Sequence, residues 1–197
     1  MGLALLVLGV ALFVAAHLSV RSRARRAALI VRWGKTVYRM LFSLVVLVAL
    51  AMITYGFARY RAEEWVDLWY PPRGMRHLAL ALMLPAVILL FTAFLPGRLK
   101  RWTRYPALLA VKIWAFAHLL ANGDLGSVIL FGGFLAWAVT ARIALKREPD
   151  ATPPPAGAAA PGGWSNDAVA VGVGVLVYLA LVFVFHPVVI GVPVLGA

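Results

Sequence analysis

The feature that most constrains this chain is a series of apolar runs separated by short basic stretches. A membrane-spanning helix needs about 20 apolar residues, because the hydrocarbon core of a bilayer is roughly 30 Å thick. Six runs approach that length: 3–20, 38–57, 77–95, 105–121, 125–144 and 168–185. They predict an all-α fold, a polytopic membrane helix bundle with about six transmembrane helices, in a single domain over residues 1–197.

Composition supports this class and excludes others. Hydrophobic residues make up 63% of the chain, whereas soluble domains average about half. There are no cysteines, which excludes disulfides, thiolate metal sites and cysteine nucleophiles. The first apolar run has no basic region before it and no small-residue cleavage site after it, so we interpret it as a span and not a signal peptide.

The net charge of +12 is best explained by the membrane topology, because the basic residues are unevenly distributed among the connections. Fifteen of the 19 Lys and Arg residues belong to the connections that follow the first, third and fifth runs, if Arg39, Lys112 and Arg142 in the adjoining runs are counted with them. Basic residues concentrate in cytoplasmic loops of membrane proteins. The pattern predicts a multi-pass membrane protein with both termini on the periplasmic or outer side. No nucleic-acid-binding signature accompanies the charge, so we expect no nucleic-acid partner.

Several local features predict structure between and within the runs. Residues 148–163 are rich in Pro, Ala and Gly and predict a flexible linker that is dispensable for folding. Pro85 predicts a kink in the third span. The sixth span is expected to end at His186-Pro187, with the apolar tail folding back on the membrane surface. Small residues four apart allow helix backbones to approach closely in lipid, and they occur at Gly132 with Ala136 and at Ala168 with Gly172, although ordinary packing within the bundle also accounts for them.

A tight turn joins the fourth and fifth runs. Asn122-Gly123 is expected to end the first helix, because both residue types tolerate a left-handed backbone. Asp124 is placed to cap the following helix, its carboxylate accepting exposed backbone N–H groups.

The four histidines all lie in or at the edge of a span: His17, His77, His118 and His186. Ionisable side chains inside a membrane are costly and need a partner. An ordinary role is a histidine that bonds a carbonyl or a headgroup, especially for His77 and His186 at predicted helix ends. Imidazole is the usual nitrogen ligand of metals and haem, and no competing acidic set is present, so the pattern favours a metal or haem over a proton relay.

The depths of the histidines in the membrane distinguish a haem site from a site for a bare metal ion. His17 lies near the inner end of its span and His118 near the outer end, so their depths differ by about 10 Å. Ligand bonds of about 2 Å disfavour a bare ion across that gap, whereas a haem with a ligand on each side could bridge it. The alternative is zinc or another divalent metal held at the outer side by His77, His118 and His186.

Two neighbours of His118 are further cofactor candidates. Lys112 could pair with a haem propionate, although snorkelling to the interface is the ordinary role of such a lysine. Trp114 lies one turn before His118 on the same helix face and could pack against a macrocycle, although tryptophans in membrane helices commonly serve in packing alone.

At these residues the chain resembles the NnrU family of bacterial membrane proteins. The strings that carry the resemblance cover nearly the whole chain: 13–17 (FVAAH), 76–78 (RHL), 82–85 (LMLP), 114–124 (WAFAHLLANGD), 130–138 (LFGGFLAWA), 186–187 (HP) and 190–193 (IGVP). Among them, HLLANGD and LFGGFLAWAV are the most specific. Some genes of the family lie near denitrification genes, and the family is related to 15-cis-zeta-carotene isomerase, a haem b membrane protein with histidine axial ligands.

The resemblance implies a location in the bacterial inner (plasma) membrane and a b-type haem with His17 and His118 as ligands. It implies a redox-dependent, isomerase-like enzyme acting on an apolar, lipid-dissolved substrate. The alternatives are a non-enzymatic accessory or electron-transfer protein of denitrification, and a purely structural subunit. Membrane lipid, a second copy of the chain or a respiratory protein would be its partners. The family usually has Arg-His-Pro where this chain has Arg104-Tyr105-Pro106, which raises the question of whether Tyr105 replaces a histidine ligand.

Overall fold

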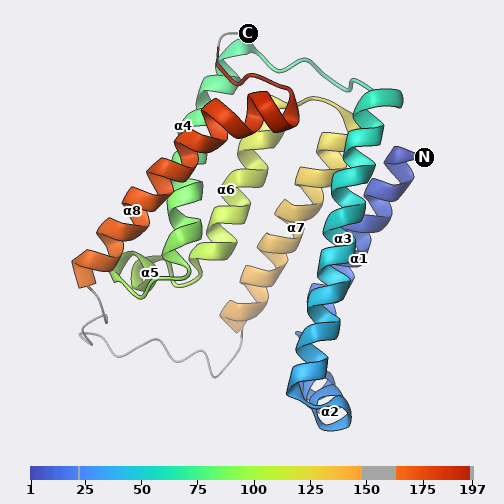
Figure 1. The fold of residues 1–197 in the computed structure, drawn as a ribbon, viewed down its shortest axis with the longest axis vertical. Helices are drawn as coiled ribbons and strands as arrows, with labels where there is room; N and C mark the ends of the chain where they lie inside the picture. Colours follow the sequence, from blue (N-terminus) through green and yellow to red (C-terminus); the bar gives the residue numbers. More distant parts are fainter. Residues whose placement is uncertain (22, 148–162, 196–197) are drawn as a thin grey trace. The chain divides into compact units, whose positions relative to one another are not determined.

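The described chain is almost entirely helical (Figure 1). The computed structural model describes residues 1–21, 23–147 and 163–195. Its elements are α1 (Gly2–Ser19), α2 (Arg23–Trp33), α3 (Lys35–Glu63), α4 (Arg73–Thr92), α5 (Arg98–Thr103), α6 (Pro106–Ala121), α7 (Leu125–Arg147), α8 (Gly163–Ala180) and the π-helix η1 (Leu181–Ile190). No β-strand occurs within these ranges, which confirms the predicted all-α class.

The predicted spans correspond to helices. Five helical segments are long and apolar enough to cross a membrane, namely α1, α3, α4, α7 and α8 with η1, and α6 is a shorter apolar helix of 16 residues. The protein is therefore a multi-pass membrane protein. One boundary was wrong: the last helix does not end at His186-Pro187 but continues as η1 to Ile190. The predicted linker, residues 148–163, lies outside the described residues except for Gly163, which begins α8.

The described chain divides into two compact units, which we treat separately. Unit 1 comprises Met1–Tyr70 and Asn122–Phe134. Its centre is an antiparallel pair of α1 and α3 whose backbones approach closely. A Cβ added at Gly9 would lie 2.9 Å from the Ile53 nitrogen, and one at Gly56 would lie 2.5 Å from the Leu6 nitrogen. Glycine at these positions allows the two helices to pack with direct backbone contact.

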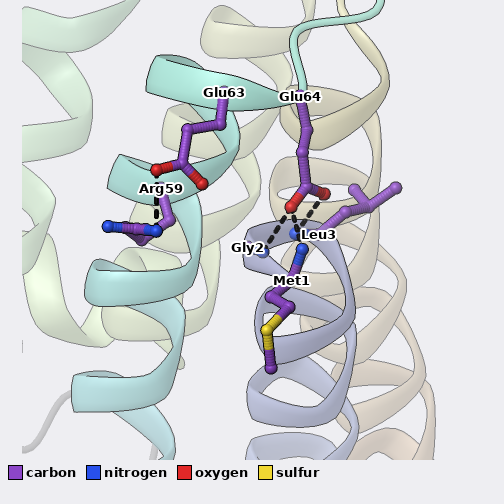
Figure 2. Close-up of polar contacts among 6 residues, drawn as sticks. All are labelled: Met1, Gly2, Leu3, Arg59, Glu63 and Glu64. Atoms are coloured by element: carbon purple, nitrogen blue, oxygen red, sulfur yellow. Dashed lines mark hydrogen bonds and ion pairs between the residues drawn. The ribbon is translucent and has the colours of Figure 1, made fainter.

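A carboxylate from the end of α3 closes the start of α1 (Figure 2). Glu64 accepts hydrogen bonds from the backbone N–H groups of Gly2 (2.7 Å) and Leu3 (3.1 Å), and it pairs with the amino group of Met1. The first N–H groups of a helix have no partner within the helix, so this carboxylate supplies one. The neighbouring Glu63 instead pairs with Arg59 on its own helix at 2.7 Å.

The first part of α7 completes unit 1. The ring of Tyr60, which is fully buried, lies against the Cα of Gly126, so that an added Cβ would be 2.3 Å from a ring carbon. The Phe134 and Phe13 rings are 4.6 Å apart between centroids. Small residues and aromatic rings therefore alternate along this contact.

Unit 2 comprises Pro71–Ala121 and Leu135–Ala197, and in it α4 packs against both α6 and α8. Two residues one turn apart fix α8 on α4. A Cβ added at Gly174 would lie 2.8 Å from the Ile88 Cα, and the Tyr178 hydroxyl donates to the Leu80 carbonyl at 3.1 Å. The helix α4 runs through Pro85 without ending there.

The beginning of α8 also holds the short helix α5. Both oxygens of the buried Asp167 carboxylate accept backbone N–H groups at the start of α5, from Arg98 (3.0 Å) and Leu99 (3.2 Å). The Arg98 guanidinium lies 4.4 Å from the Trp164 ring centroid. The connection after α4 is thus anchored to the helix that follows the linker in sequence.

Two local predictions about glycines need correction. Within the described residues, an added Cβ at Gly132 or Gly172 would meet no atom within 4 Å, so these are not the residues at which helices approach closely. The helix α6 ends at Ala121, directly before Asn122-Gly123, as predicted, but Gly123 does not have a left-handed backbone. It is needed because the Trp69 carbonyl approaches so closely that an added Cβ would lie 1.9 Å from the carbonyl oxygen.

Candidate functional site

His118 lies in the last turn of α6 and is half-buried. Its Nδ1 donates a hydrogen bond to the Trp114 carbonyl at 2.8 Å, one turn earlier in the same helix. The Trp114 indole also contacts the imidazole, with 5.3 Å between ring centroids. Trp114 therefore both orients and covers His118.

His186 lies in η1 and is also half-buried. Its Nδ1 donates to the Leu181 carbonyl at 2.9 Å, five residues earlier. Pro187 follows and has no N–H, and Gly191 ends the helix with φ 75° in the left-handed region. Long π-helical stretches are rare, and shorter π-bulges are frequent at functional sites. The π-helix sets the direction in which the His186 ring points.

The structure brings His118 and His186 together within unit 2. Their ring centroids are 6.4 Å apart and their planes differ by 26°. Two imidazole nitrogens bound to one metal at about 2 Å each leave ring centroids roughly 6 Å apart. The separation and the donor chemistry therefore fit a group that takes two imidazole ligands.

His17 lies in the last turn of α1, in unit 1. Its Nδ1 donates to the Phe13 carbonyl at 2.8 Å. Two rings surround it, with centroids 4.1 Å (Phe13) and 5.4 Å (Phe42) from the imidazole. The pairing of His17 with His118 stays a prediction, because the two residues belong to different units.

The three histidines share one protonation pattern. A carbonyl oxygen can only accept, so in each neutral ring Nδ1 must carry the proton and Nε2 must carry the lone pair. A backbone carbonyl bound to one ring nitrogen is the usual way in which proteins fix a histidine whose other nitrogen binds a metal. The sequence could not predict this hydrogen bond. Every histidine in a helix has a carbonyl one turn earlier, and the sequence does not show whether the ring turns toward it.

The other candidates are arranged differently. His77 is exposed in the first turns of α4. Lys112 precedes His118 by six residues on α6, which places it about 9 Å along the helix and about 120° around it. Among the residues that the structure describes, no three His, Asp or Glu side chains form a group that could hold a metal ion. The described part therefore offers histidine pairs and not a three-residue cluster.

Tyr105 cannot share a metal with His118. It immediately precedes α6, whereas His118 is near the other end, 13 residues or about 20 Å away. Its ring lies under the Arg142 guanidinium, 4.5 Å from the centroid. Arg104, before it, has an unusual φ of 59° for a residue that is not glycine. Tyr105 therefore belongs to the opposite end of unit 2.

The turn after α6 is built as a small polar clasp in unit 1. Asp124 is 1% exposed and accepts the Ser127 N–H at 2.9 Å, which confirms its predicted role as the cap of α7. The Gly123 carbonyl accepts N–H groups from Leu68 (2.8 Å) and Trp69 (3.0 Å), and Leu125 donates to the Val66 carbonyl at 3.0 Å. These bonds tie the turn to the connection between α3 and α4.

Comparison with known proteins gives one result. The family model described as NnrU protein matches residues 5–194. No curated protein and no solved structure matches the chain.

Proposed function

The chain belongs to the NnrU protein family, and from that premise we propose that it is an integral membrane b-type haem protein in which His118 binds the iron. The observation that carries the proposal is the approach of the His118 and His186 imidazoles, whose ring centroids are 6.4 Å apart with planes 26° from parallel, the spacing of two imidazoles on one metal. The Trp114 ring beside the imidazole would pack against the macrocycle.

Two histidines are candidates for the second ligand. The resemblance implies His17, whose imidazole has the same fixed tautomer. The geometry of unit 2 favours His186, whose ring centroid is 6.4 Å from that of His118. Each candidate would give the iron two neutral imidazoles and hence a low-spin, six-coordinate centre.

The activity that follows from this site is a redox-dependent isomerisation of an apolar substrate dissolved in the membrane. A bound haem supplies an iron centre whose ligand affinity changes with its oxidation state. The chain contributes the imidazoles that hold the iron and a helix bundle that a lipid-soluble molecule can reach from the bilayer. Chromatographic analysis of a cis-polyene incubated with oxidised and reduced protein tests the activity. Haem that cycles between oxidation states without isomerising the polyene would favour electron transfer in denitrification.

Visible spectroscopy of purified variants tests the haem site. Wild-type protein should show a Soret band and sharp low-spin bands on reduction, and His118→Ala should lose most of its haem. His118→Gly should recover haem when imidazole is added, because free imidazole can occupy the vacated ligand position; a merely structural histidine would not be rescued in this way. His77→Ala is the matched control and should keep the wild-type spectrum.

The second ligand is identified by the same spectra. A change to five-coordinate, high-spin iron in His186→Ala, with His17→Ala unchanged, assigns His186; the reverse result assigns His17. Wild-type haem content and spectrum in His118→Ala would overturn the proposal. So would pure protein that contains stoichiometric zinc and no haem, which would indicate the alternative metal site of His77, His118 and His186.

A further inference from the structure

The helix α2 concentrates positive charge where unit 1 turns between two spans. Seven Lys and Arg residues lie between residues 21 and 39, and no acidic residue occurs before Glu63. Four of the seven belong to α2 and two to the first turns of α3. A surface with this concentration of positive charge attracts anionic partners.

One face of α2 is apolar and exposed. Ala24, Ala27, Ala28 and Val31 follow the helical spacing i, i+3, i+4, i+7, and all four are exposed, Val31 by 87%. The residues between them include Leu29 and Ile30, which are half-buried. The helix therefore has an inner side toward α3 and a second apolar stripe, Ala24-Ala27-Ala28-Val31, that no described residue covers.

Within unit 1, α2 lies at the level expected for the membrane surface. His17, near the end of α1, lies beside Phe42, so the first two turns of α3 extend beyond α1. The helix α2 lies at that end of α3 (Figure 1). Gly34, with φ 79°, makes the sharp turn between α2 and α3. Since α1 and α3 both span the bilayer, α2 lies where their apolar segments end and lipid headgroups begin.

We propose that α2 is an interfacial helix that binds anionic lipid headgroups of the membrane in which the protein is embedded. The stripe Ala24-Ala27-Ala28-Val31 enters the boundary between headgroups and acyl chains. Arg25 and Arg32, which lie about 90–110° around the helix from the centre of the stripe, contact lipid phosphates. An exposed apolar stripe flanked by arginines is the pattern of helices that lie in the membrane plane.

Lipid is a better candidate than a soluble protein for the partner of the stripe, because α2 is joined directly to a membrane span at each end. The two connections of α2 enter spans on both sides, so the helix is held against the bilayer and meets headgroups before it meets any protein. The absence of acidic residues over the first 62 positions matches a uniformly anionic surface.

The cysteine-free chain allows a direct test. Val31→Cys, carrying a nitroxide spin label, is reconstituted into vesicles of phosphatidylcholine alone or mixed with phosphatidylglycerol. We expect the label to become shielded from an aqueous nickel chelate and accessible to oxygen in the anionic vesicles. Arg25→Gln with Arg32→Gln should weaken the headgroup binding behind this response about 30-fold, because each basic residue near an anionic surface contributes about 1 kcal/mol and about 1.4 kcal/mol is a factor of ten.

A control with the same change in net charge is Arg73→Gln with Arg76→Gln, which should leave the response of the Val31 label intact. A label equally exposed to the nickel chelate in both vesicles would overturn the proposal and leave the stripe open to a soluble partner. Equal shielding in both vesicles, unchanged by Arg25→Gln with Arg32→Gln, would overturn it as well, because binding would then not depend on anionic headgroups.

Discussion

At the scale of single residues, Glu64 shows how a charge is used at the edge of the membrane (Figure 2). The amino group of Met1, with the backbone N–H groups of Leu3 and Gly2, lowers the pKa of Glu64 from 4.5 to about 2. All three groups favour the ionised carboxylate, which in turn satisfies the start of α1. The residue joins the first helix to the end of the third.

This pKa shift predicts a pH dependence of stability. Because the pKa of Glu64 is lower in the folded protein, its contribution is present above pH 4.5 and is lost as the pH falls from 4.5 toward 2. We expect the thermal unfolding midpoint of wild-type protein in detergent to fall more steeply over this range than that of Glu64→Gln. Glu63→Gln is the control and should follow the wild type; parallel curves for wild type and Glu64→Gln would contradict the prediction.

Sequence patterns predicted some residue roles and not others. The cap by Asp124 follows from its position before an apolar helix, and the structure confirms it. The role of Gly123 does not, because the sequence cannot show that the distant Trp69 carbonyl approaches it. The tautomers of His17, His118 and His186 likewise depend on side-chain direction, which hydropathy does not reveal.

At the scale of elements, the length of the apolar runs predicted the spans. Two further helices were missed because their sequences are strongly basic. The basic stretches around residues 23–33 and 98–103 were interpreted as loops, yet they form α2 and α5. Arginine and lysine are good helix formers, so a basic stretch is compatible with a helix at the membrane surface. The end of α8 was misplaced for a related reason: Pro187 indicated a stop, but η1 accommodates it inside a π-helix.

The contact between α8 and α4 gives a prediction with an internal control. Gly174→Ala would force its Cβ within 2.8 Å of the Ile88 Cα, so we expect a loss of about 1–3 kcal/mol of stability from overpacking. Gly172→Ala, two residues earlier, meets open space and should be neutral or stabilising by up to about 1 kcal/mol. Thermal unfolding midpoints in detergent compare the two; equal destabilisation would contradict the packing argument.

At the scale of the whole molecule, the clasp between residues 68–69 and Gly123 leads to a prediction about the number of crossings. The chain leaves Tyr70, enters α4, and returns to Gly123, which is hydrogen-bonded to Leu68 and Trp69. If α4 crosses the membrane, we expect α6 to carry the chain back, although it has only 16 residues. Together with the five longer segments this would give the six crossings that the apolar runs predict.

Labelling of single cysteines tests this topology. Tyr70→Cys should react with an impermeant maleimide from outside the cell, whereas Trp102→Cys and Arg147→Cys should react only from the cytoplasmic side, as the basic connections predict. Tyr70 and Trp102 are 82% and 89% exposed, so access is not limiting. Labelling of Trp102→Cys and Arg147→Cys from opposite faces would show that α6 does not cross.

The clasp at Gly123 also has a consequence for biosynthesis. Its two halves, residues 66–69 and 123–125, are more than 50 positions apart in the chain. The first hairpin, α1 and α3, can form early, but the connection after α3 keeps unpaired backbone groups until both α4 and α6 have been synthesised. The hydrogen bonds of this connection are therefore completed late in synthesis, when the chain has passed residue 125.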